Sequence, residues 1–272
     1  MKLSLSARIA EHEHRKDSTA ISFEELAILA KETGYVGLCI RPSQATVDSP
    51  KETIHEMREV MDRHGLVPSM VTLDQVIATN TDEAGRPQRE IDRHLDYAQI
   101  LGAKLIRIAI KNDDDVQATR TACDAAKERG MLLLQQTHTD SPAETIDGCV
   151  DLVKRIDHSS FGLTVEPGNL MLGGEDYGPN EMRCLAPHVH NVYLQNMQLN
   201  SNGTSSVPTN QGEAAYDRLI VGEEGGIDNE RFFNGLKAIK YDGFVTAHQP
   251  SMPDRSPRDL AEFVAERLSP YL

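Results

Sequence analysis

Short runs of β-branched and leucine residues alternate with longer amphipathic stretches along the whole chain. The short runs have the length of buried strands, whereas the amphipathic stretches repeat apolar residues at the spacing of one helix face. The predicted strands are Leu3–Ser6, Val36–Arg41, Val67–Thr72, Lys104–Ile110, Met131–Thr137, Phe161–Glu166, Val189–Asn196 and Phe244–His248. The predicted helices lie near residues 23–33, 51–64, 88–101, 115–129, 142–156, 179–186, 228–239 and 257–268. Eight strand–helix units in one unbroken series predict an α/β fold, a single (β/α)8 TIM barrel over residues 1–272.

Glycines stand between several predicted helices and the strands that follow them. These glycines are Gly34, Gly65, Gly102, Gly130 and Gly243. A glycine at this place is typical of a helix C-cap in the left-handed conformation. Two longer segments after strands, roughly residues 73–87 and 197–226, are expected to be irregular. Loops that follow strands build the active-site face of a barrel, so we expect both segments to be functional.

Composition narrows the classes of partner. The 28 Lys and Arg residues against 42 Asp and Glu give a net charge of −14, which would repel nucleic acids and anionic membranes. Four widely spaced cysteines without a CxxC pair argue against a zinc knuckle, an iron–sulfur site or a redox pair. The first 30 residues show no signal-peptide core, and no apolar run approaches 18 residues. We therefore expect a reduced, cytoplasmic protein, either a monomer or a homo-oligomer.

Polar residues gather where the last four predicted strands end. The segments are Gln135–His138, Glu166–Asn169, Tyr193–Asn196 and His248–Gln249. Because side chains alternate along a strand, Gln136 shares a face with His138, and Tyr193 shares one with Gln195. A divalent cation held by carboxylate, imidazole and amide groups would satisfy such a buried cluster. For any one of these residues, the alternative is an ordinary core residue that is hydrogen-bonded to its neighbours.

Several sequence strings resemble the xylose isomerase-like TIM barrels, a superfamily of sugar isomerases, epimerases and related lyases. The strings are GYVGLCIRP, LGAKLIRIA, GMLLLQQTH, FGLTVEPGNL, HVHNVYLQNM, GGID and YDGFVTAHQP, so the resemblance covers nearly the whole chain. The usual metal quartet of that family, Glu, Asp, His and Glu, would fall on Gln136, Glu166, Tyr193 and His248. Of these positions only Glu166 keeps a carboxylate.

This altered quartet changes what the resemblance implies. We expect Glu166 and His248 to bind one divalent cation, with His138, Gln136 or Gln195 completing the set. Two imidazoles and one carboxylate favour Mn²⁺, Fe²⁺, Co²⁺ or Zn²⁺ over Mg²⁺. The family's glutamate proton shuttle is not expected, because an amide does not accept a proton at a useful pKa. A site without metal, in which the polar residues bond to one another, is the alternative.

Cationic residues at the ends of earlier strands predict an anionic substrate. Arg41 and Arg107 can each hold a carboxylate with two parallel hydrogen bonds, and Lys111 follows the fourth strand. For Lys111, ion pairing with the Asp113–Asp115 run is an equal alternative. Further residues expected at the mouth are Arg8, His12, His14, Asn169 and Asn196.

These features favour a metal-assisted decarboxylase of a small polyhydroxy β-keto acid. The strings LSLSARIAEH, QTH, EPGN and YLQN resemble the 3-oxo-isoapionate decarboxylase branch, which acts in apionate catabolism. In this interpretation Arg41 or Arg107 holds the carboxylate, and Tyr193 or His138 delivers the final proton. One alternative is an isomerase or epimerase of a small ketose or keto acid, with His138 or His248 as proton carrier. A barrel that only binds a sugar acid or a protein partner is the other.

Overall fold

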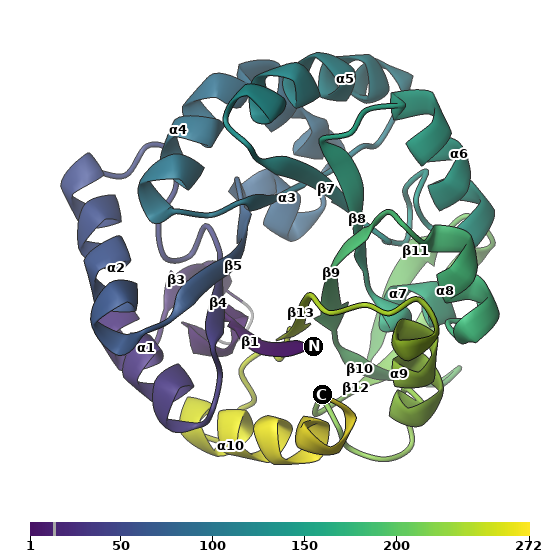
Figure 1. Ribbon diagram of the computed structural model, residues 1–272. Helices are drawn as coiled ribbons and strands as arrows, with labels where there is room; N and C mark the ends of the chain where they lie inside the picture. The colour runs from purple at the N-terminus through teal and green to yellow at the C-terminus, as the bar shows by residue number, and fades with distance from the viewer. Residues whose placement is uncertain (13–14) are drawn as a thin grey trace.

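A closed barrel of eight parallel strands forms the centre of the protein, seen in a computed structural model that describes residues 1–12 and 15–272 (Figure 1). The strands are β1 (Lys2–Ser6), β4 (Gly37–Ile40), β5 (Val67–Thr72), β6 (Leu105–Ile108), β7 (Leu132–Gln136), β8 (Phe161–Val165), β9 (Val189–Leu194) and β13 (Phe244–Ala247). Around the barrel they follow one another in chain order, and β13 closes the ring against β1. The predicted (β/α)8 barrel is confirmed.

Helices surround the barrel and follow the strands in turn (Figure 1). They are α1 (Phe23–Glu32), α2 (Lys51–His64), α4 (Ile91–Leu101), α5 (Asp113–Glu128), α6 (Ile146–Ile156), α8 (Pro179–Leu185), α9 (Asn229–Ala238) and α10 (Pro257–Leu268). Helix α6 begins four residues later than predicted, because Thr145 rather than an earlier residue accepts the capping hydrogen bond from Gly148. Four of the five predicted cap glycines have a positive φ, but the left-handed residue after α9 is Lys240, not Gly243.

Two segments predicted to be irregular contain regular structure, so that prediction is wrong. The segment after β5 forms α3 (Gln75–Thr79) and the 3₁₀ helix η2 (Asp82–Glu90). The segment after β9 forms the antiparallel sheet β10 (Asn196–Leu199), β12 (Gly212–Leu219) and β11 (Ser205–Thr209). The predicted strand Val189–Asn196 therefore divides at Gln195 into β9 and β10.

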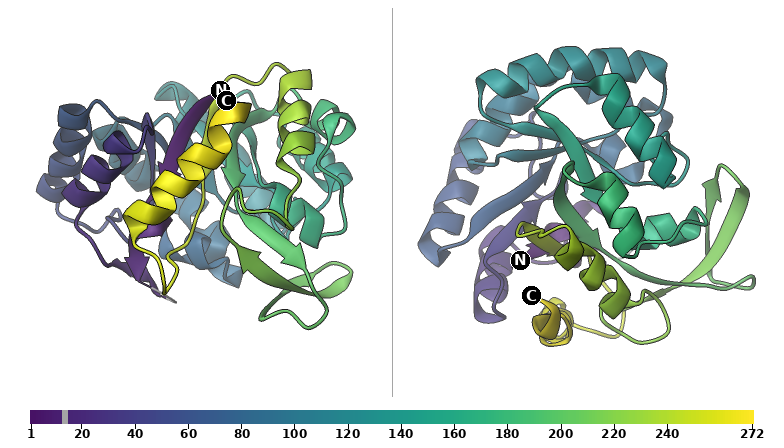
Figure 2. Two further views of the ribbon diagram at one scale, coloured as in Figure 1. Left: turned by 90° about the horizontal axis from the view of Figure 1, so that it is seen from below. Right: turned by 45° about the vertical axis from the view of Figure 1, so that its right-hand side comes forward.

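The remaining short elements follow barrel strands or end the chain. They are the 3₁₀ helix η1 (Ala7–Ala10), the hairpin strands β2 (Glu11–His12) and β3 (Arg15–Thr19), α7 (Pro167–Leu172) and the 3₁₀ helix η3 (Ser269–Tyr271). The antiparallel sheet projects from the end of the barrel opposite the two termini (Figure 2). This end holds the carboxyl ends of the barrel strands, where barrel enzymes place their sites.

Apolar side chains of the described residues form three clusters, the smallest of which, Leu172, Met197 and Tyr216, lies between α7 and the antiparallel sheet. A large cluster lies between the barrel strands and the outer helices, and a small one, formed by Cys39, Met70, Leu134 and Tyr193, lies inside the barrel. The inner cluster closes the barrel, so polar residues beyond it form the floor of a cavity. Within the described ranges, no helix has both the length and the apolar character needed to cross a membrane.

Candidate active site

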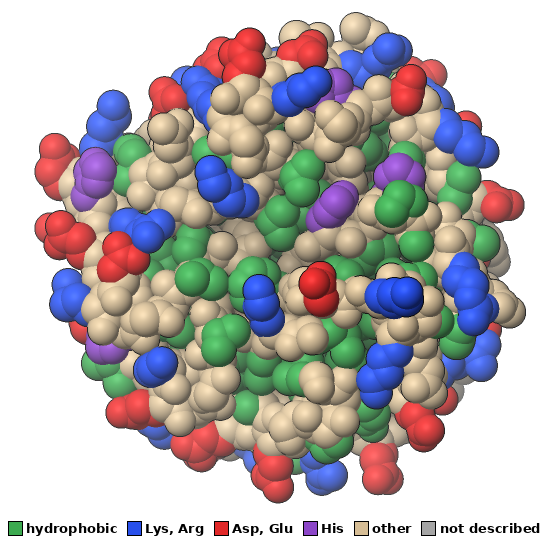
Figure 3. Space-filling model, viewed as in Figure 1, with side chains coloured by type: hydrophobic (Ala, Val, Ile, Leu, Met, Phe, Trp, Pro, Cys, Tyr) green, Lys and Arg blue, Asp and Glu red, His purple; other side chains and the backbone are tan. Residues whose placement is uncertain are grey.

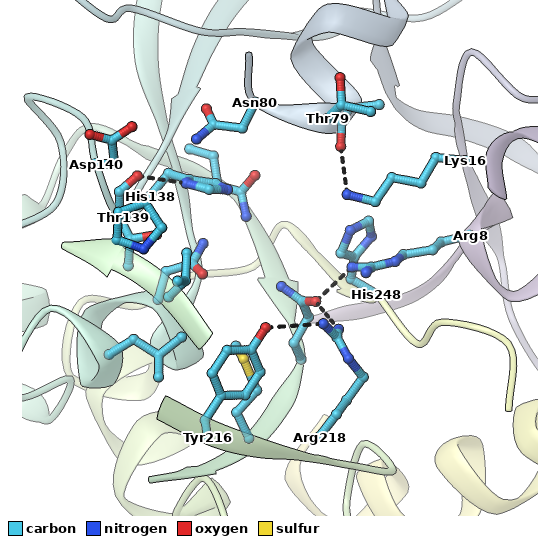
Figure 4. Close-up of a pocket in the computed structure, with 18 of the residues that line it drawn as sticks. Arg8, Lys16, Thr79, Asn80, His138, Thr139, Asp140, Tyr216, Arg218 and His248 are labelled. Atoms are coloured by element: carbon cyan, nitrogen blue, oxygen red, sulfur yellow. Dashed lines mark hydrogen bonds between the residues drawn. The ribbon is translucent and has the colours of Figure 1, made fainter. Parts of the chain in front are cut away.

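A cavity of about 280 Å³ opens at the carboxyl ends of the barrel strands (Figure 4). Its walls combine residues from barrel strands with residues from the β2–β3 hairpin, the segment after β5 and the antiparallel sheet. Those that matter for its chemistry are Arg8, Lys16, Arg107, Gln136, His138, Asp140, Asn169, Gln195, Tyr216, Arg218 and His248. The volume is close to the lower end of the range for small-molecule sites.

The cavity is strongly cationic although the whole chain is acidic. Arg8, Lys16, Arg107 and Arg218 line it, whereas the carboxylate in its wall, Asp140, is exposed and accepts a hydrogen bond of 2.9 Å from Lys111 Nζ. On the opposite face, which carries the termini, acidic and basic side chains are intermixed (Figure 3). The positive charge is thus concentrated at the cavity, where it favours a small anion.

Among the described residues, Arg107 has the fewest hydrogen-bond partners of these four cations. Its side chain is 4% exposed, its guanidinium lies over the Tyr193 ring at 5.9 Å, and its Nε has no hydrogen-bond partner in the described part of the chain. Burial, with a smaller contribution from Arg41, lowers the pKa of Arg107 to about 10, so it stays charged at neutral pH. Gln136 Oε1 is a second buried atom that the described residues leave without a partner. A bound carboxylate and a hydroxyl group would satisfy both.

Glu166 does not line the cavity itself, but it fixes the orientation of Gln195, which does. Glu166 Oε1 accepts hydrogen bonds from the backbone N–H groups of Gly168 and Gln195, and its Oε2 accepts one of 3.1 Å from Gln195 Nε2. This fixes the amide so that Gln195 Oε1 accepts from Arg8 at 2.6 Å and from Arg218 at 3.1 Å. Burial raises the pKa of Glu166 to about 7, despite these hydrogen bonds.

Two neutral imidazoles face the cavity. His138 Nδ1 donates to the carbonyl of Thr139 at 2.9 Å, which leaves the lone pair on Nε2. Burial and nearby Arg107 lower the pKa of His138 to about 4, and burial and Arg8 lower the pKa of His248 well below its usual value. Tyr193 lies beneath His248, with the rings stacked at 4.2 Å, and its hydroxyl pairs with Cys39 Sγ at 2.9 Å.

The structure brings together seven of the twelve predicted site residues at the cavity wall. They are Arg8, Arg107, Gln136, His138, Asn169, Gln195 and His248. Glu166 and Tyr193 support this wall from behind, through Gln195 and His248 respectively.

Three predicted substrate contacts lie elsewhere. Arg41 is buried in an ion pair with Glu11, in which Nε donates to Oε1 at 2.6 Å. Lys111 pairs with Asp140 at the rim, not with the Asp113–Asp115 run as the alternative proposed. Asn196 donates to the carbonyls of Ile220 and Glu223, so its amide holds a loop in place. His12 is exposed beside a neighbouring hollow, and His14 lies outside the described residues.

Sequence reasoning missed Lys16, Arg218 and Tyr216. Lys16 belongs to β3, and the other two belong to β12, elements that were not predicted at all. Arg218 donates to both Gln195 Oε1 and the Tyr216 hydroxyl, which places it firmly in the wall (Figure 4). Residues Gly212–Leu219 show no regular alternation of apolar and polar side chains, so the sequence carried no clear signal for this strand.

The residues at the family's metal positions do not fit a divalent cation. Both oxygens of Glu166 already accept hydrogen bonds, and Tyr193 points its hydroxyl into the inner apolar cluster. Among the described residues no group of three or more His, Cys, Asp or Glu side chains converges as a donor set. Arg8, Arg107 and Lys16 also place positive charge beside His248. Such surroundings oppose cation binding and favour an anion.

Comparison with known proteins agrees with the fold. The profile of the xylose isomerase-like TIM barrel family matches residues 27–268. No curated protein matches the sequence. Similar solved structures include the probable 3-DHS dehydratase AsbF from Bacillus anthracis, with a TM-score of 0.74, 16% identity and 99% of each chain covered.

Two further structures show how varied these neighbours are. A D-allulose 3-epimerase from Methylomonas sp. has a TM-score of 0.70 and 15% identity, over 100% of this chain and 98% of its own. A xylose isomerase-like TIM barrel protein from Mycobacterium smegmatis, in complex with magnesium, has a TM-score of 0.66 and 16% identity, over 92% and 89%. At such identities structural likeness shows the fold alone, but the profile match spans most of the sequence. The chain belongs to the xylose isomerase-like TIM barrel family.

Proposed function

We propose that the protein is a decarboxylase of a small polyhydroxy β-keto acid, with 3-oxo-isoapionate as the first substrate to test. The observation that carries this proposal is Arg107, a buried guanidinium that faces a cationic cavity and whose Nε lacks a protein partner in the described ranges. A buried charge of this kind is unfavourable until an anion pairs with it. The substrate's carboxylate supplies that anion.

Hydroxyl groups of the substrate have partners in the same cavity. Gln136 Oε1 accepts a hydrogen bond from one hydroxyl group, and Asn169 lies in the cavity wall. Gln195 holds Arg8 and Arg218 side by side without neutralising them, because an amide oxygen carries no net charge. These groups orient the acid so that its ketone faces the remaining cations.

Loss of CO₂ moves negative charge from the carboxylate towards the ketone oxygen. Cations near the ketone therefore interact more strongly with the transition state than with the bound substrate, which raises kcat. Arg107, at the carboxylate, contributes mainly to binding and so to KM. We assign the ketone end to Arg8, which enters the cavity together with Lys16 from the side opposite His138 (Figure 4).

Proton transfer distinguishes this proposal from the second candidate, an isomerase or epimerase. The neutral His138 and His248 both line the cavity, and two such bases could remove and return a proton. The family also includes a solved neighbour described as an epimerase. However, decarboxylation needs a single protonation at carbon and no proton abstraction from carbon.

The test uses purified protein incubated with 3-oxo-isoapionate or with neutral ketoses in deuterated water. A decarboxylase releases one CO₂ per product molecule and leaves unreacted substrate free of deuterium. Deuterium in recovered ketose, together with isomer formation and no CO₂, would transfer the assignment to the second candidate.

A further inference from the structure

Lys16 occupies an unusual place for a lysine in this molecule. It lies on β3, in a hairpin that overhangs the barrel mouth, and its Nζ donates to the carbonyl of Ala78 at 3.1 Å. Its side chain is half-buried in the wall of the cavity and points across it (Figure 4). In the described part of the chain, no ion pair to a carboxylate is formed by Lys16, unlike Lys111.

The surroundings of Lys16 favour its neutral amine. Burial comes first, and the positive charges of Arg8, Arg41 and Arg107 add to it; together they lower the pKa of Lys16 to about 7, against a smaller opposing effect of Glu11. An amine with such a pKa is partly unprotonated at neutral pH, whereas an ordinary lysine is almost fully charged. Neighbouring cations and desolvation are known means of activating a lysine as a nucleophile.

Lys16 also has access to water from a second side. A neighbouring hollow of about 510 Å³ shares Arg8, Lys16 and Arg218 with the first cavity. Reactions that release and later consume water at the amine therefore have a route to solvent that does not cross the bound substrate.

We propose that Lys16 is a catalytic nucleophile that forms an imine with the ketone of the substrate. This inference rests on the proposed function, and in it the imine is the group that accepts the electron pair when CO₂ leaves. The Nζ lone pair attacks the ketone carbon. The carbonyl oxygen then takes one proton from the attacking nitrogen and one from solvent and leaves as water, which gives a protonated imine. The bond to the carboxylate then breaks, CO₂ departs, and the electron pair moves into the imine to give an enamine.

The remaining steps restore the enzyme. The enamine takes one proton at carbon from a water molecule, for which the lone pair of His138 Nε2 is an acceptor in the cavity wall, and becomes a protonated imine again. One water then hydrolyses the imine, releases the ketone product and the Lys16 amine, and returns to solvent the proton that was taken up in the first step. The water formed in the first step balances the water used in the last, and no oxidant or reductant is needed.

Reductive trapping tests the nucleophile without depending on the natural substrate. Wild-type protein is incubated with acetoacetate and sodium cyanoborohydride, and the labelled peptide is identified by mass spectrometry. Lys16→Arg keeps the charge but cannot form an imine, and Lys104→Arg, on the exposed side of the barrel, is the matched control. We expect one adduct on the Lys16 peptide in the wild type and in Lys104→Arg, and none in Lys16→Arg. Labelling that is absent from the wild type, or unchanged in Lys16→Arg, would overturn the proposal.

Turnover of 3-oxo-isoapionate separates this inference from the proposed function. An imine pathway requires product formed in H₂¹⁸O to carry labelled ketone oxygen from the first turnover, and kcat of a folded Lys16→Arg should fall at least about 100-fold. Release of CO₂ at an undiminished kcat by Lys16→Arg overturns the nucleophile but leaves the decarboxylase proposal intact. Absence of CO₂ from the wild type, with the acetoacetate adduct present on Lys16, instead overturns the decarboxylase and retains the nucleophile.

Discussion

Replacing Arg107 by methionine should make the protein more stable and less able to bind an anion. The guanidinium is buried, and its Nε lacks a hydrogen-bond partner in the described residues, so the folded state bears the cost of desolvating it. Methionine is unbranched and uncharged, although it is shorter than arginine by the end of the guanidinium, and it can pack against the Tyr193 ring that Arg107 now covers. Removing one partner of a buried ion pair usually destabilises a protein. Removing the buried charge of Arg107, which has no carboxylate partner in the described residues, should instead increase the free energy of unfolding.

The size of the effect follows from the pKa of Arg107. Lowering it to about 10 from an ordinary value above 12 corresponds to about 3 kcal/mol at ~1.36 kcal/mol per pKa unit. The buried charge belongs to the protonated form of Arg107, so this cost is present at every pH below about 10. Loss of the cation–π contact offsets about 1–2 kcal/mol of it. A net gain of about 1–2 kcal/mol remains, which raises Tm by roughly 2–8 °C in a chain of this size.

Thermal unfolding at pH 7, with and without malonate as a carboxylate probe, measures both effects. Malonate should raise Tm of the wild type and leave Arg107→Met almost unchanged, since the lost contact amounts to roughly 2–4 kcal/mol of binding. Arg183→Met, on the exposed surface of α8, is the control and should alter stability by less than about 0.5 kcal/mol. An Arg107→Met protein that is about 3 kcal/mol less stable yet still binds malonate would refute the reasoning.

Three further outcomes follow from other buried charges. Glu11→Gln leaves Arg41 buried without its carboxylate, so urea unfolding should show a loss of about 3–5 kcal/mol, and a loss below about 1 kcal/mol would contradict this. Because the pKa of Glu166 is raised, its ionisation destabilises the fold above about pH 7, and this cost disappears as pH falls towards 4.5. The wild-type protein should therefore gain about 3 kcal/mol in free energy of unfolding when the pH falls from about 7 to 4.5, and Glu166→Gln should show no such gain. Urea unfolding at several pH values in this range measures the difference. Acylation of Lys16, mapped by mass spectrometry, should reach half its maximal rate near pH 7, and a midpoint near pH 10 would be inconsistent with its surroundings.

The barrel was predictable because each of its strands carries a local signal. Strand β5 and helices α2 and α10 match their predicted bounds, since apolar periodicity and end signals act within a few residues. The extra sheet was not predicted because β11 and β12 have few buried residues and many Ser, Thr and Gly residues, which are equally typical of loops.

The site was predictable only in part, for a related reason. Position at a strand end placed Arg107, Gln136 and His248 at the mouth, but it could not show which cation has a partner. Arg41 finds Glu11 about 30 positions away in the chain, and Lys16 reaches the cavity through a hairpin that crosses the mouth. Such pairings depend on the tertiary fold, so local patterns in a single sequence do not show them.

The most direct test of the central claim follows the carbon atom that should leave. Protein treated with a chelator is incubated with 3-oxo-isoapionate labelled with ¹³C at the carboxylate, in deuterated water, and the reaction is monitored by ¹³C NMR. The account predicts stoichiometric labelled CO₂ and bicarbonate, with one deuterium on the product carbon that lost the carboxylate. Retention of the label in the substrate, with deuterium exchanged into it or an isomer formed, would contradict the account.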